Sequence, residues 1–286
     1  MRYYICLVVL ALCTPVSSAH PGIQSLKVAV KNRREVNIYR NIRYAVRPDS
    51  IGSDTSSDRT LDLYMPVIVK GTLPVYLFIH GGGFSGGDKK GTEAFCSKLA
   101  SFGYAVVSIN YRLYLKHHKI PGASCSANMS KGLPSDGKFN PALEKAIKIA
   151  SEDAQMALAW IKQHTKAHNL NSSSIVISGG SAGAITALYT AYASNQNILK
   201  IKAVVDLWGG LETSDVIKKG APPLLIFHGD EDKLIHIDYA YALKKRMDEI
   251  GNSKTEIHIM KGKGHARYDL ITNERMGELV SFLQKL

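Results

Sequence analysis

Ser181 is the residue in this chain whose sequence neighbours most clearly suggest a catalytic role. It is the centre of the pentapeptide Gly-Gly-Ser-Ala-Gly at 179–183, which directly follows the apolar run 174–178. A serine on a sharp turn from a strand into a helix presents its hydroxyl outward, and flanking glycines remove side chains that would collide there. Because glycine-rich turns are common, the pentapeptide alone is weak evidence, and a nucleophilic role for Ser181 requires partners.

A candidate acid and a candidate base follow Ser181, at the ends of two later apolar runs. Asp232 comes after the run 223–227, and His265 comes after the run 255–260. A serine becomes a nucleophile when a base lies within hydrogen-bond reach and an acid orients that base. Serine, acid and histidine in this order, each at the carboxyl end of a strand, match the chain order of an α/β-hydrolase triad.

Three consecutive glycines form a third element of the pattern. They occupy 81–83, after the apolar run 74–79 and His80. Glycines in series let backbone N–H groups converge on one point, which is how a protein provides donors for a developing oxyanion. A flexible loop is the alternative, but a position at the carboxyl end of a predicted strand argues against it.

The elements that must position these residues alternate between strand and helix. This alternation predicts an α/β fold with a mostly parallel sheet, helices on both faces and ligands at the carboxyl ends of the strands. The predicted strands are 61–64, 74–79, 104–109, 174–178, 201–207, 223–227 and 255–260, and the predicted helices are 91–101, 142–168, 184–194, 237–250 and a last one from about 273.

From about residue 61 to the C-terminus, the chain resembles an α/β-hydrolase of the secreted serine-esterase kind. It is similar to the hormone-sensitive-lipase-like carboxylesterases and to the bacterial feruloyl and acetyl-xylan esterases. This resemblance implies one α/β-hydrolase domain at 20–286 without a large lid domain. The motifs that carry it are 61–66, 80–84, 110–113, 151–154 with Trp160, 179–183, Asp232 and His265.

The resemblance also implies roles for individual residues. Ser181 is the nucleophile, His265 is its base and Asp232 orients the imidazole. The family spacing His-Gly-x-x-Asp selects Asp232 over its neighbours Asp230 and Glu231 and over Asp206. The oxyanion hole is expected from the backbone N–H groups of Gly82, Gly83 and Ala182. An ion pair between Arg112 and Asp153 is expected to be structural rather than catalytic.

The chain departs from the family pattern in two places. A long insertion, 113–141, separates the Asn-Tyr-Arg-Leu motif from the helix that carries Asp153, and we expect it to be irregular. The segment from 208 to 222 is short, which leaves little room for a lid and favours a small or exposed ester.

The N-terminus has the pattern of a secretory signal peptide. A positive stretch at 1–4 precedes an apolar run at 5–13 and small residues at 14–19, so we expect cleavage after 19 and a secreted, extracellular or periplasmic, protein. The apolar run is too short for a membrane span, which needs about 20 residues. In an oxidising compartment Cys96 and Cys125 form a plausible disulfide, with two free thiols as the alternative.

Composition narrows the remaining function classes. The 286 residues carry a formal charge of +12 and are 45% hydrophobic, as expected of a globular protein with a basic surface. The basic residues are scattered without interleaved aromatic residues, so we expect no nucleic-acid partner. We also expect no metal, no cofactor and no transmembrane segment in the mature chain, and a small-molecule or polysaccharide-linked ester as substrate.

Two other functions remain as alternatives to ester hydrolysis. Relatives of prolyl oligopeptidase share the sheet and the triad and hydrolyse peptides, although they carry a propeller domain or a longer N-terminal extension. A binding protein without catalysis can also be built on this fold, but such proteins have typically lost the nucleophile. The acyl group, the alcohol and the oligomeric state are open at this point.

Overall fold

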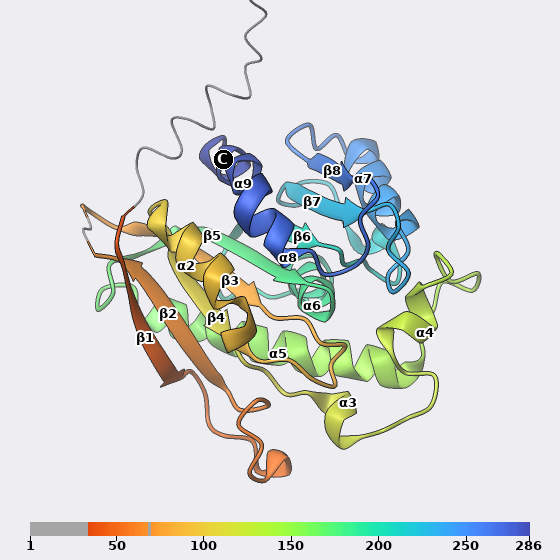
Figure 1. The fold of residues 1–286 in the computed structure, drawn as a ribbon, viewed down its shortest axis with the longest axis horizontal. Coiled ribbons are helices and arrows are strands. Elements are labelled where there is room, and N and C mark those ends of the chain that lie inside the picture. Colours follow the sequence, from red (N-terminus) through yellow and green to blue (C-terminus); the bar gives the residue numbers. More distant parts are fainter. Residues whose placement is uncertain (1–33, 68–69) are drawn as a thin grey trace, which may run out of the picture.

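The computed structural model of the protein describes residues 34–67 and 70–286 (Figure 1). Within these residues, eight strands form one sheet in the order β1-β2-β4-β3-β5-β6-β7-β8. β2 is antiparallel to both β1 and β4, and every later pair is parallel, so the predicted mostly parallel sheet is confirmed. The strands are β1 (Val36–Arg43), β2 (Thr60–Pro66), β3 (Leu73–Ile79), β4 (Ala105–Ile109), β5 (Leu170–Gly180), β6 (Ile201–Leu207), β7 (Leu224–Gly229) and β8 (Glu256–Met260).

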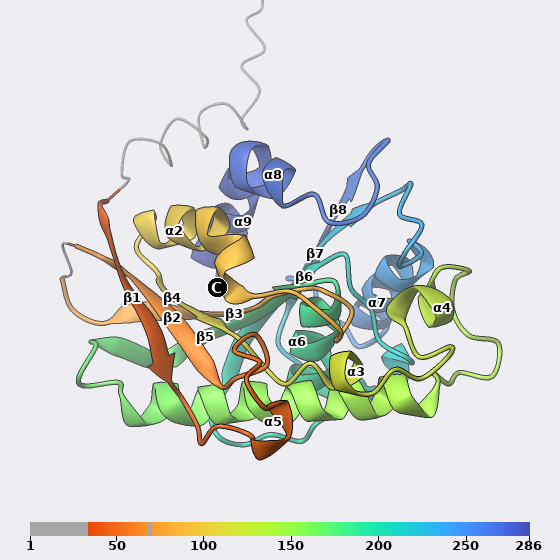
Figure 2. The same ribbon diagram turned by 60° about the horizontal axis from the view of Figure 1, so that its bottom comes forward.

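Helices cover both faces of the sheet (Figure 2). On one face lie α5 (Pro141–Gln163), α6 (Ala182–Tyr192) and α7 (Asp238–Glu249), and on the other lie α2 (Glu93–Ser101) and α9 (Met276–Gln284). Strand β3 shows why its sequence is continuously apolar. Val75 and Leu77 belong to the first core cluster, whereas Tyr76 and Phe78 belong to the second, so both faces of the strand are buried.

Most predicted elements are present with shifted ends. The predicted helix 142–168 ends at Gln163, because the chain turns over 164–169 and Asn169 has a φ of 51° before β5 begins. The predicted last helix is a short α8 (Tyr268–Leu270), a π-helical turn η4 (Ile271–Arg275) and α9. Strand β1 was not predicted, since an edge strand with mostly exposed or half-exposed side chains lacks the apolar pattern of a buried one.

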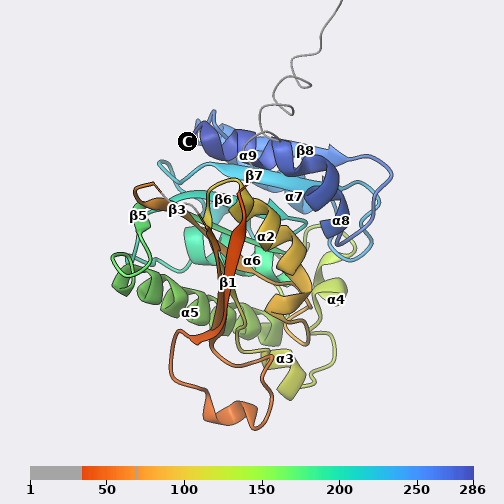
Figure 3. The ribbon, with the colours of Figure 1, turned by 60° about the vertical axis from the view of Figure 1, so that its left-hand side comes forward.

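The insertion 113–141 is more ordered than predicted. It contains α3 (Tyr114–His117) and α4 (Cys125–Met129), and its start is tied to the loop after η1 (Asp49–Ile51). The Lys116 ammonium lies 2.9 Å from the carboxylate of Asp54, so α3 is held beside this loop (Figure 3). At the other end, the His236 N–H donates to the Met129 carbonyl at 2.9 Å, which connects α4 to the segment after β7.

The predicted disulfide between Cys96 and Cys125 is contradicted by the structure, in which both are free and buried. Cys96 lies on α2 in the core cluster of one face, whereas Cys125 lies on α4 in the cluster of the other face. The sheet therefore separates the two thiols, and a disulfide requires Cα atoms within about 7 Å.

The predicted signal peptide, 1–19, lies outside the described residues. Among the helices of residues 34–67 and 70–286, none is long and apolar enough to cross a membrane.

Candidate active site

Ser181 lies on the turn between β5 and α6 in a backbone conformation that non-glycine residues rarely adopt. Its φ is 55° and its ψ is −121°, so the turn is strained and presents the side chain away from the sheet. The flanking glycines are required by contact. A β-carbon on Gly179 would lie 2.3 Å from the carbonyl carbon of Gly183, and one on Gly183 would lie 2.0 Å from the Ile79 carbonyl oxygen.

Ser181, His265 and Asp232 form one hydrogen-bonded chain. The Ser181 Oγ lies 2.8 Å from His265 Nε2, and His265 Nδ1 lies 2.6 Å from Asp232 Oδ2. Because a carboxylate only accepts, Nδ1 carries the imidazole proton and Nε2 is free to accept the serine proton. The structure thus brings together, from three distant parts of the chain, the residues that the sequence pattern selected.

The environment of Asp232 keeps it ionised. Burial acts to raise the pKa of its carboxyl, but the hydrogen bond from His265 and the backbone N–H groups of Ile235 and Leu234 outweigh burial and hold the pKa below its ordinary value. These two N–H groups donate to Oδ1 at 3.0 and 2.9 Å. Oδ2 is thereby left to face the imidazole, in the geometry of an acid that orients a catalytic histidine.

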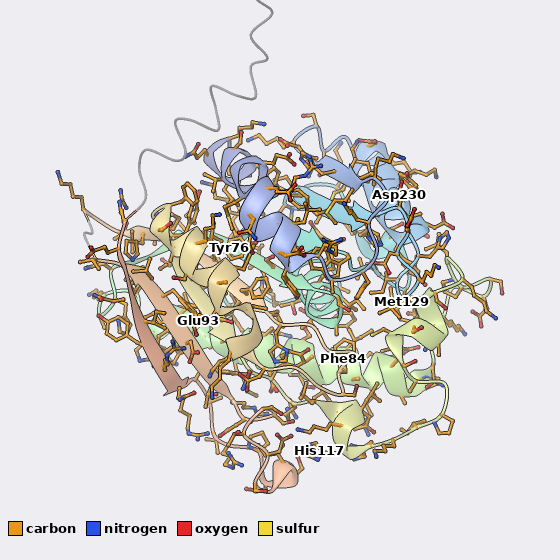
Figure 4. All side chains as sticks on the ribbon, viewed as in Figure 1. Tyr76, Phe84, Glu93, His117, Met129 and Asp230 are labelled. Carbon is orange, nitrogen blue, oxygen red and sulfur yellow. The ribbon has the colours of Figure 1, made fainter. Side chains whose placement is uncertain are left out.

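Two of the rival acids, Asp230 and Asp206, lie in other environments, and within the described part of the chain neither is hydrogen-bonded to His265. Asp230 lies 3.2 Å from the Lys261 ammonium and accepts from the Gly262 N–H at 2.7 Å, on the surface beside β7 (Figure 4). Asp206, in β6, is buried and accepts from the Gly209 N–H at 2.7 Å. Burial raises the pKa of Asp206 to about 7.

The glycine loop after β3 lies against the nucleophile turn. A β-carbon on Gly81 would lie 3.2 Å from the Ser181 β-carbon, and Gly82 and Gly83 have φ values of 118° and 63°. No residue of the described chain accepts from the N–H groups of Gly82 and Gly83. The N–H of Ala182 belongs to the first turn of α6, where backbone donors have no partner within the helix. These three donors are available near Ser181, and their role in an oxyanion hole stays a prediction.

His80 braces the glycine loop. Its Nδ1 lies 2.7 Å from the Gly81 carbonyl oxygen, and its ring stacks on Tyr111 with centroids 4.6 Å apart. The Tyr111 hydroxyl donates to the His80 carbonyl at 2.9 Å. Burial lowers the pKa of His80 to about 4, so its ring is neutral near pH 7.

Lys89 holds the far end of this loop and was missed by sequence analysis. Its side chain is buried, its ammonium lies 3.0 Å from the buried Asp62 carboxylate, and its backbone N–H donates to the Asn110 side chain at 2.7 Å. The sequence shows only two adjacent lysines, which ordinarily indicate a solvated surface. No local signal distinguishes a lysine that is buried by distant strands.

A pocket of about 510 Å³ opens above Ser181 and His265. The glycine loop forms its floor, and the insertion supplies a wall that the sequence did not predict. Next to it lies a second hollow of about 340 Å³ that shares Gly83, Ser85 and Ser124 with the first. The pocket wall includes Ser124, Cys125 and Ser126 from the insertion, Leu234 and Ile235 from the segment after β7, and Tyr268.

The predicted ion pair between Arg112 and Asp153 is present, with the guanidinium 3.0 Å from the carboxylate. Arg59, which the sequence analysis did not select, also lies 2.9 Å from this carboxylate. The pair joins the segment after β4 to α5, which is a structural role. Among the described residues, no group of three or more His, Cys, Asp or Glu side chains is arranged to hold a metal ion.

Two curated bacterial proteins resemble parts of the chain. It is 32% identical over 133 residues to Lipase 2 of Moraxella sp., and 31% identical over 163 residues to fumonisin B1 esterase of Sphingopyxis macrogoltabida. These alignments cover 46% and 54% of this chain but 23% and 28% of the relatives. The chain thus spans about a quarter of the length of each of these two relatives.

Solved structures show the same fold over nearly the whole chain. A propionate-bound thermophilic esterase from Thermogutta terrifontis superposes with a TM-score of 0.62 at 19% identity, covering 88% of this chain and 94% of that one. A second structure, an esterase 2 of the same organism phosphonylated by cyclosarin, gives a TM-score of 0.64 at 21% identity, covering 87% and 94%. Both support the α/β-hydrolase fold.

Family models match both halves of the chain. The BD-FAE model matches residues 61–125, which hold β2, β3, the glycine loop and β4. The phospholipase/carboxylesterase model matches residues 135–286, more than half of the chain, including Ser181, Asp232 and His265. The chain therefore belongs to the phospholipase/carboxylesterase family of α/β-hydrolases.

Proposed function

We propose that the protein hydrolyses carboxylic esters through an acyl-enzyme intermediate on Ser181. The observation that carries this proposal is the hydrogen-bonded chain from Ser181 through His265 to Asp232, at the base of a pocket. The hydroxyl, the base and the acid are already aligned, so the reaction requires only that an ester carbonyl enter the pocket.

In acylation, the Ser181 oxygen attacks the ester carbonyl carbon while its proton moves to His265 Nε2. The resulting imidazolium is stabilised by Asp232, and the carbonyl oxygen becomes an oxyanion that accepts from the N–H groups of Gly82, Gly83 and Ala182. When the tetrahedral species collapses, the bond to the alkoxy oxygen breaks. His265 returns its proton to that oxygen, and the alcohol leaves.

In deacylation, water replaces the alcohol. His265 Nε2 takes one proton from water as its oxygen attacks the acyl carbon, and the same donors hold the second oxyanion. Collapse of this intermediate breaks the bond to the Ser181 oxygen, which recovers its proton from His265. The products are a carboxylic acid and the free serine.

The substrates are short-chain esters or acetyl and feruloyl esters attached to polysaccharide. In support, the segment between β6 and β7 contains only a single short 3-10 turn, η3 (Ser214–Val216), so this part of the described chain supplies no domain-sized cover. An uncovered pocket of about 510 Å³ admits an ester that projects from a polymer. Residues 61–125 match the BD-FAE model, which describes feruloyl-esterase-like domains, and this match supports the same substrate class.

Export from the cell is the second part of the proposal. It is supported by the positive stretch, the apolar run and the small residues within 1–19. N-terminal sequencing of protein recovered from the source cells tests it, because export with cleavage predicts a chain that begins after residue 19. A protein that is retained inside the cell with Met1 intact contradicts this part alone.

A fluorophosphonate probe, which reacts with activated serines, tests the nucleophile. We expect labelling of the native protein and of Ser126→Ala, which changes another pocket serine, and none of Ser181→Ala. Folded native protein that resists the probe would favour a binding protein without catalysis.

Matched substrates then test the bond that is cleaved. We expect turnover of p-nitrophenyl esters and much slower turnover of p-nitroanilide amides with the same acyl group. Faster cleavage of the amides would favour a peptidase. Acetyl, butyryl, octanoyl and feruloyl esters compared under the same conditions identify the acyl group that the pocket prefers.

A further inference from the structure

We propose that His228 is a positioning residue that holds Asp232 and the adjoining pocket wall in one arrangement. His228 lies at the end of β7, four residues before Asp232, and its side chain is completely buried. The mechanism described above does not use it. This role presupposes the proposed ester hydrolysis, because Asp232 affects turnover only if Ser181 and His265 react.

The contacts of His228 identify the form of its imidazole. Nε2 lies 2.9 Å from the Ile235 carbonyl oxygen and 3.5 Å from Asp232 Oδ2. Because a carbonyl oxygen only accepts, Nε2 carries the proton, and Nδ1 is the bare nitrogen. Nδ1 is buried and has no hydrogen-bond partner among the described residues, as fits the neutral ring.

Ile235 connects His228 to the catalytic acid. Its carbonyl accepts from His228, and its N–H donates to Asp232 Oδ1 at 3.0 Å. The peptide groups on both sides of Ile235 are therefore fixed, one by the imidazole and one by the carboxylate. Turning the Asp232 carboxylate or moving this segment would break hydrogen bonds that water does not replace, since His228 is buried.

The same segment forms part of the pocket wall. Leu234 and Ile235 line the pocket above Ser181, and both donate their backbone N–H groups to Asp232. His228 thus fixes the direction of the acid and the position of the wall through one hydrogen bond. A displacement of Ile235 would change both at once.

The neutral state of His228 protects the pairing of Asp232 with His265. Burial lowers the pKa of His228, and the nearby imidazoles of His265 and His236 act in the same direction, while the bond to Ile235 and the charge of Asp232 oppose them. A charged His228 would compete with His265 for the single carboxylate. The neutral ring adds a directed N–H group without adding a second cation.

A double-mutant cycle with Asp232→Asn separates this role from a general contribution to packing. His228→Gln keeps an amide N–H at the length of the imidazole Nε2, whereas His228→Met has a similar length and no donor. His258→Phe is the matched control, because His258 lies on the neighbouring strand β8, stacked on Phe227 and paired with Glu278 at 3.0 Å rather than with Asp232.

The readouts are kcat/KM for p-nitrophenyl acetate and the melting temperature of each variant. We expect His228→Met to lower kcat/KM about 10- to 100-fold, as for the loss of a hydrogen bond that positions a charged group. We expect His228→Gln to restore most of that loss and His258→Phe to have little effect. In the Asp232→Asn background, His228→Met should lower kcat/KM by about threefold at most, because coupled residues are not additive.

Equal losses from His228→Met in the two backgrounds, or no loss in the native background, would overturn this role while leaving ester hydrolysis intact. A native protein that neither hydrolyses esters nor reacts with a fluorophosphonate would overturn the proposed function and the role of His228 with it. If the methionine variant does not fold, His228→Asn carries the comparison, since its amide is too short to reach Ile235.

Discussion

Asp232 and Asp230 are two positions apart, yet their surroundings give them different chemistry. Asp232 is buried and lies 2.6 Å from His265, whereas Asp230 is at the surface beside Lys261. This difference depends on the turn after Asp232, in which the backbone N–H groups of Leu234 and Ile235 donate to the Asp232 carboxylate. Sequence spacing selected Asp232 by resemblance to a family, and the structure supplies the physical reason.

The first prediction compares the two carboxylates. Asp232→Asn should lower kcat about 10³- to 10⁴-fold, because the amide no longer stabilises the imidazolium and favours the wrong tautomer of His265. Asp230→Asn should keep near-native kcat, since its bonds are to Gly262 and Lys261. Turnover of p-nitrophenyl acetate measures both, with circular dichroism to verify folding. A large loss for Asp230→Asn with near-native turnover for Asp232→Asn would show that the acid is misassigned.

The second prediction concerns Asp206, whose Oδ2 is buried without a partner in the described chain. Burial raises the pKa of Asp206 to about 7 in the folded protein. An acid whose folded pKa is raised contributes stability that is complete below its unfolded pKa and is lost as pH rises through the folded pKa. Between an ordinary value near 3.8 and about 7, this loss is on the order of 4 kcal/mol.

Asp206→Asn removes this titration while keeping an oxygen that can accept from the Gly209 N–H. Urea unfolding at pH 4, 6 and 8 should therefore show the variant gaining stability relative to the native protein as pH rises. Asp230→Asn serves as the control, because its carboxyl is at the surface. Parallel stability curves for native protein and Asp206→Asn would mean that Asp206 does not titrate in this range.

At the scale of elements, the insertion 113–141 matters most, because its helix α4 forms part of the pocket wall. α4 places Cys125 and Ser126 on the pocket and is held to the segment after β7 through Met129 and His236. The pocket is therefore limited on one side by a short helix rather than by a separate domain. Acyl groups of different length should meet this wall to different extents.

The third prediction tests that wall. Ser126→Phe fills part of the pocket, so KM for feruloyl and octanoyl esters should rise about tenfold or more, as for a bulky group excluded from a fitted site. The KM for acetyl esters, whose short acyl group ends near Ser181, should change by about twofold at most. Ser173→Phe, an exposed serine in β5, is the control. Equal changes for acetyl and feruloyl esters would show that α4 does not limit the acyl group.

The elements that could be predicted are those with a local physical signal. β3, β6 and β7 are mostly apolar and almost wholly buried, and the glycines at 179 and 183 mark a turn too tight for side chains. Three features could not be predicted, because each depends on contacts between residues far apart in sequence. They are strand β1, the pocket wall formed by α4, and the burial of Lys89. The burial of Lys89 arises only when Asp62 and Asn110 are brought beside it by strands β2 and β4.

At the scale of the whole molecule, the sheet divides the interior into two core clusters. This division explains why the sequence analysis was wrong about the cysteines. In the sequence, Cys96 on a predicted helix and Cys125 on the insertion are the two cysteines that remain after the predicted signal peptide, which makes them candidates for a disulfide. In the folded protein the buried residues of α2 and α4 belong to different core clusters, and each thiol is buried in its own cluster.

The fourth prediction follows from this separation. Iodoacetamide added in denaturant, without reductant, should alkylate Cys96 and Cys125 completely, whereas the folded protein should react slowly. Burial raises the pKa of both thiols to about 12, which keeps them protonated and poorly nucleophilic. Peptide mass spectrometry distinguishes alkylated from bridged cysteine, and Cys96→Ala should leave the melting temperature within a few degrees, as for a small cavity rather than a lost crosslink. A disulfide-linked peptide that contains both cysteines would contradict the burial of Cys96 and Cys125 in separate core clusters.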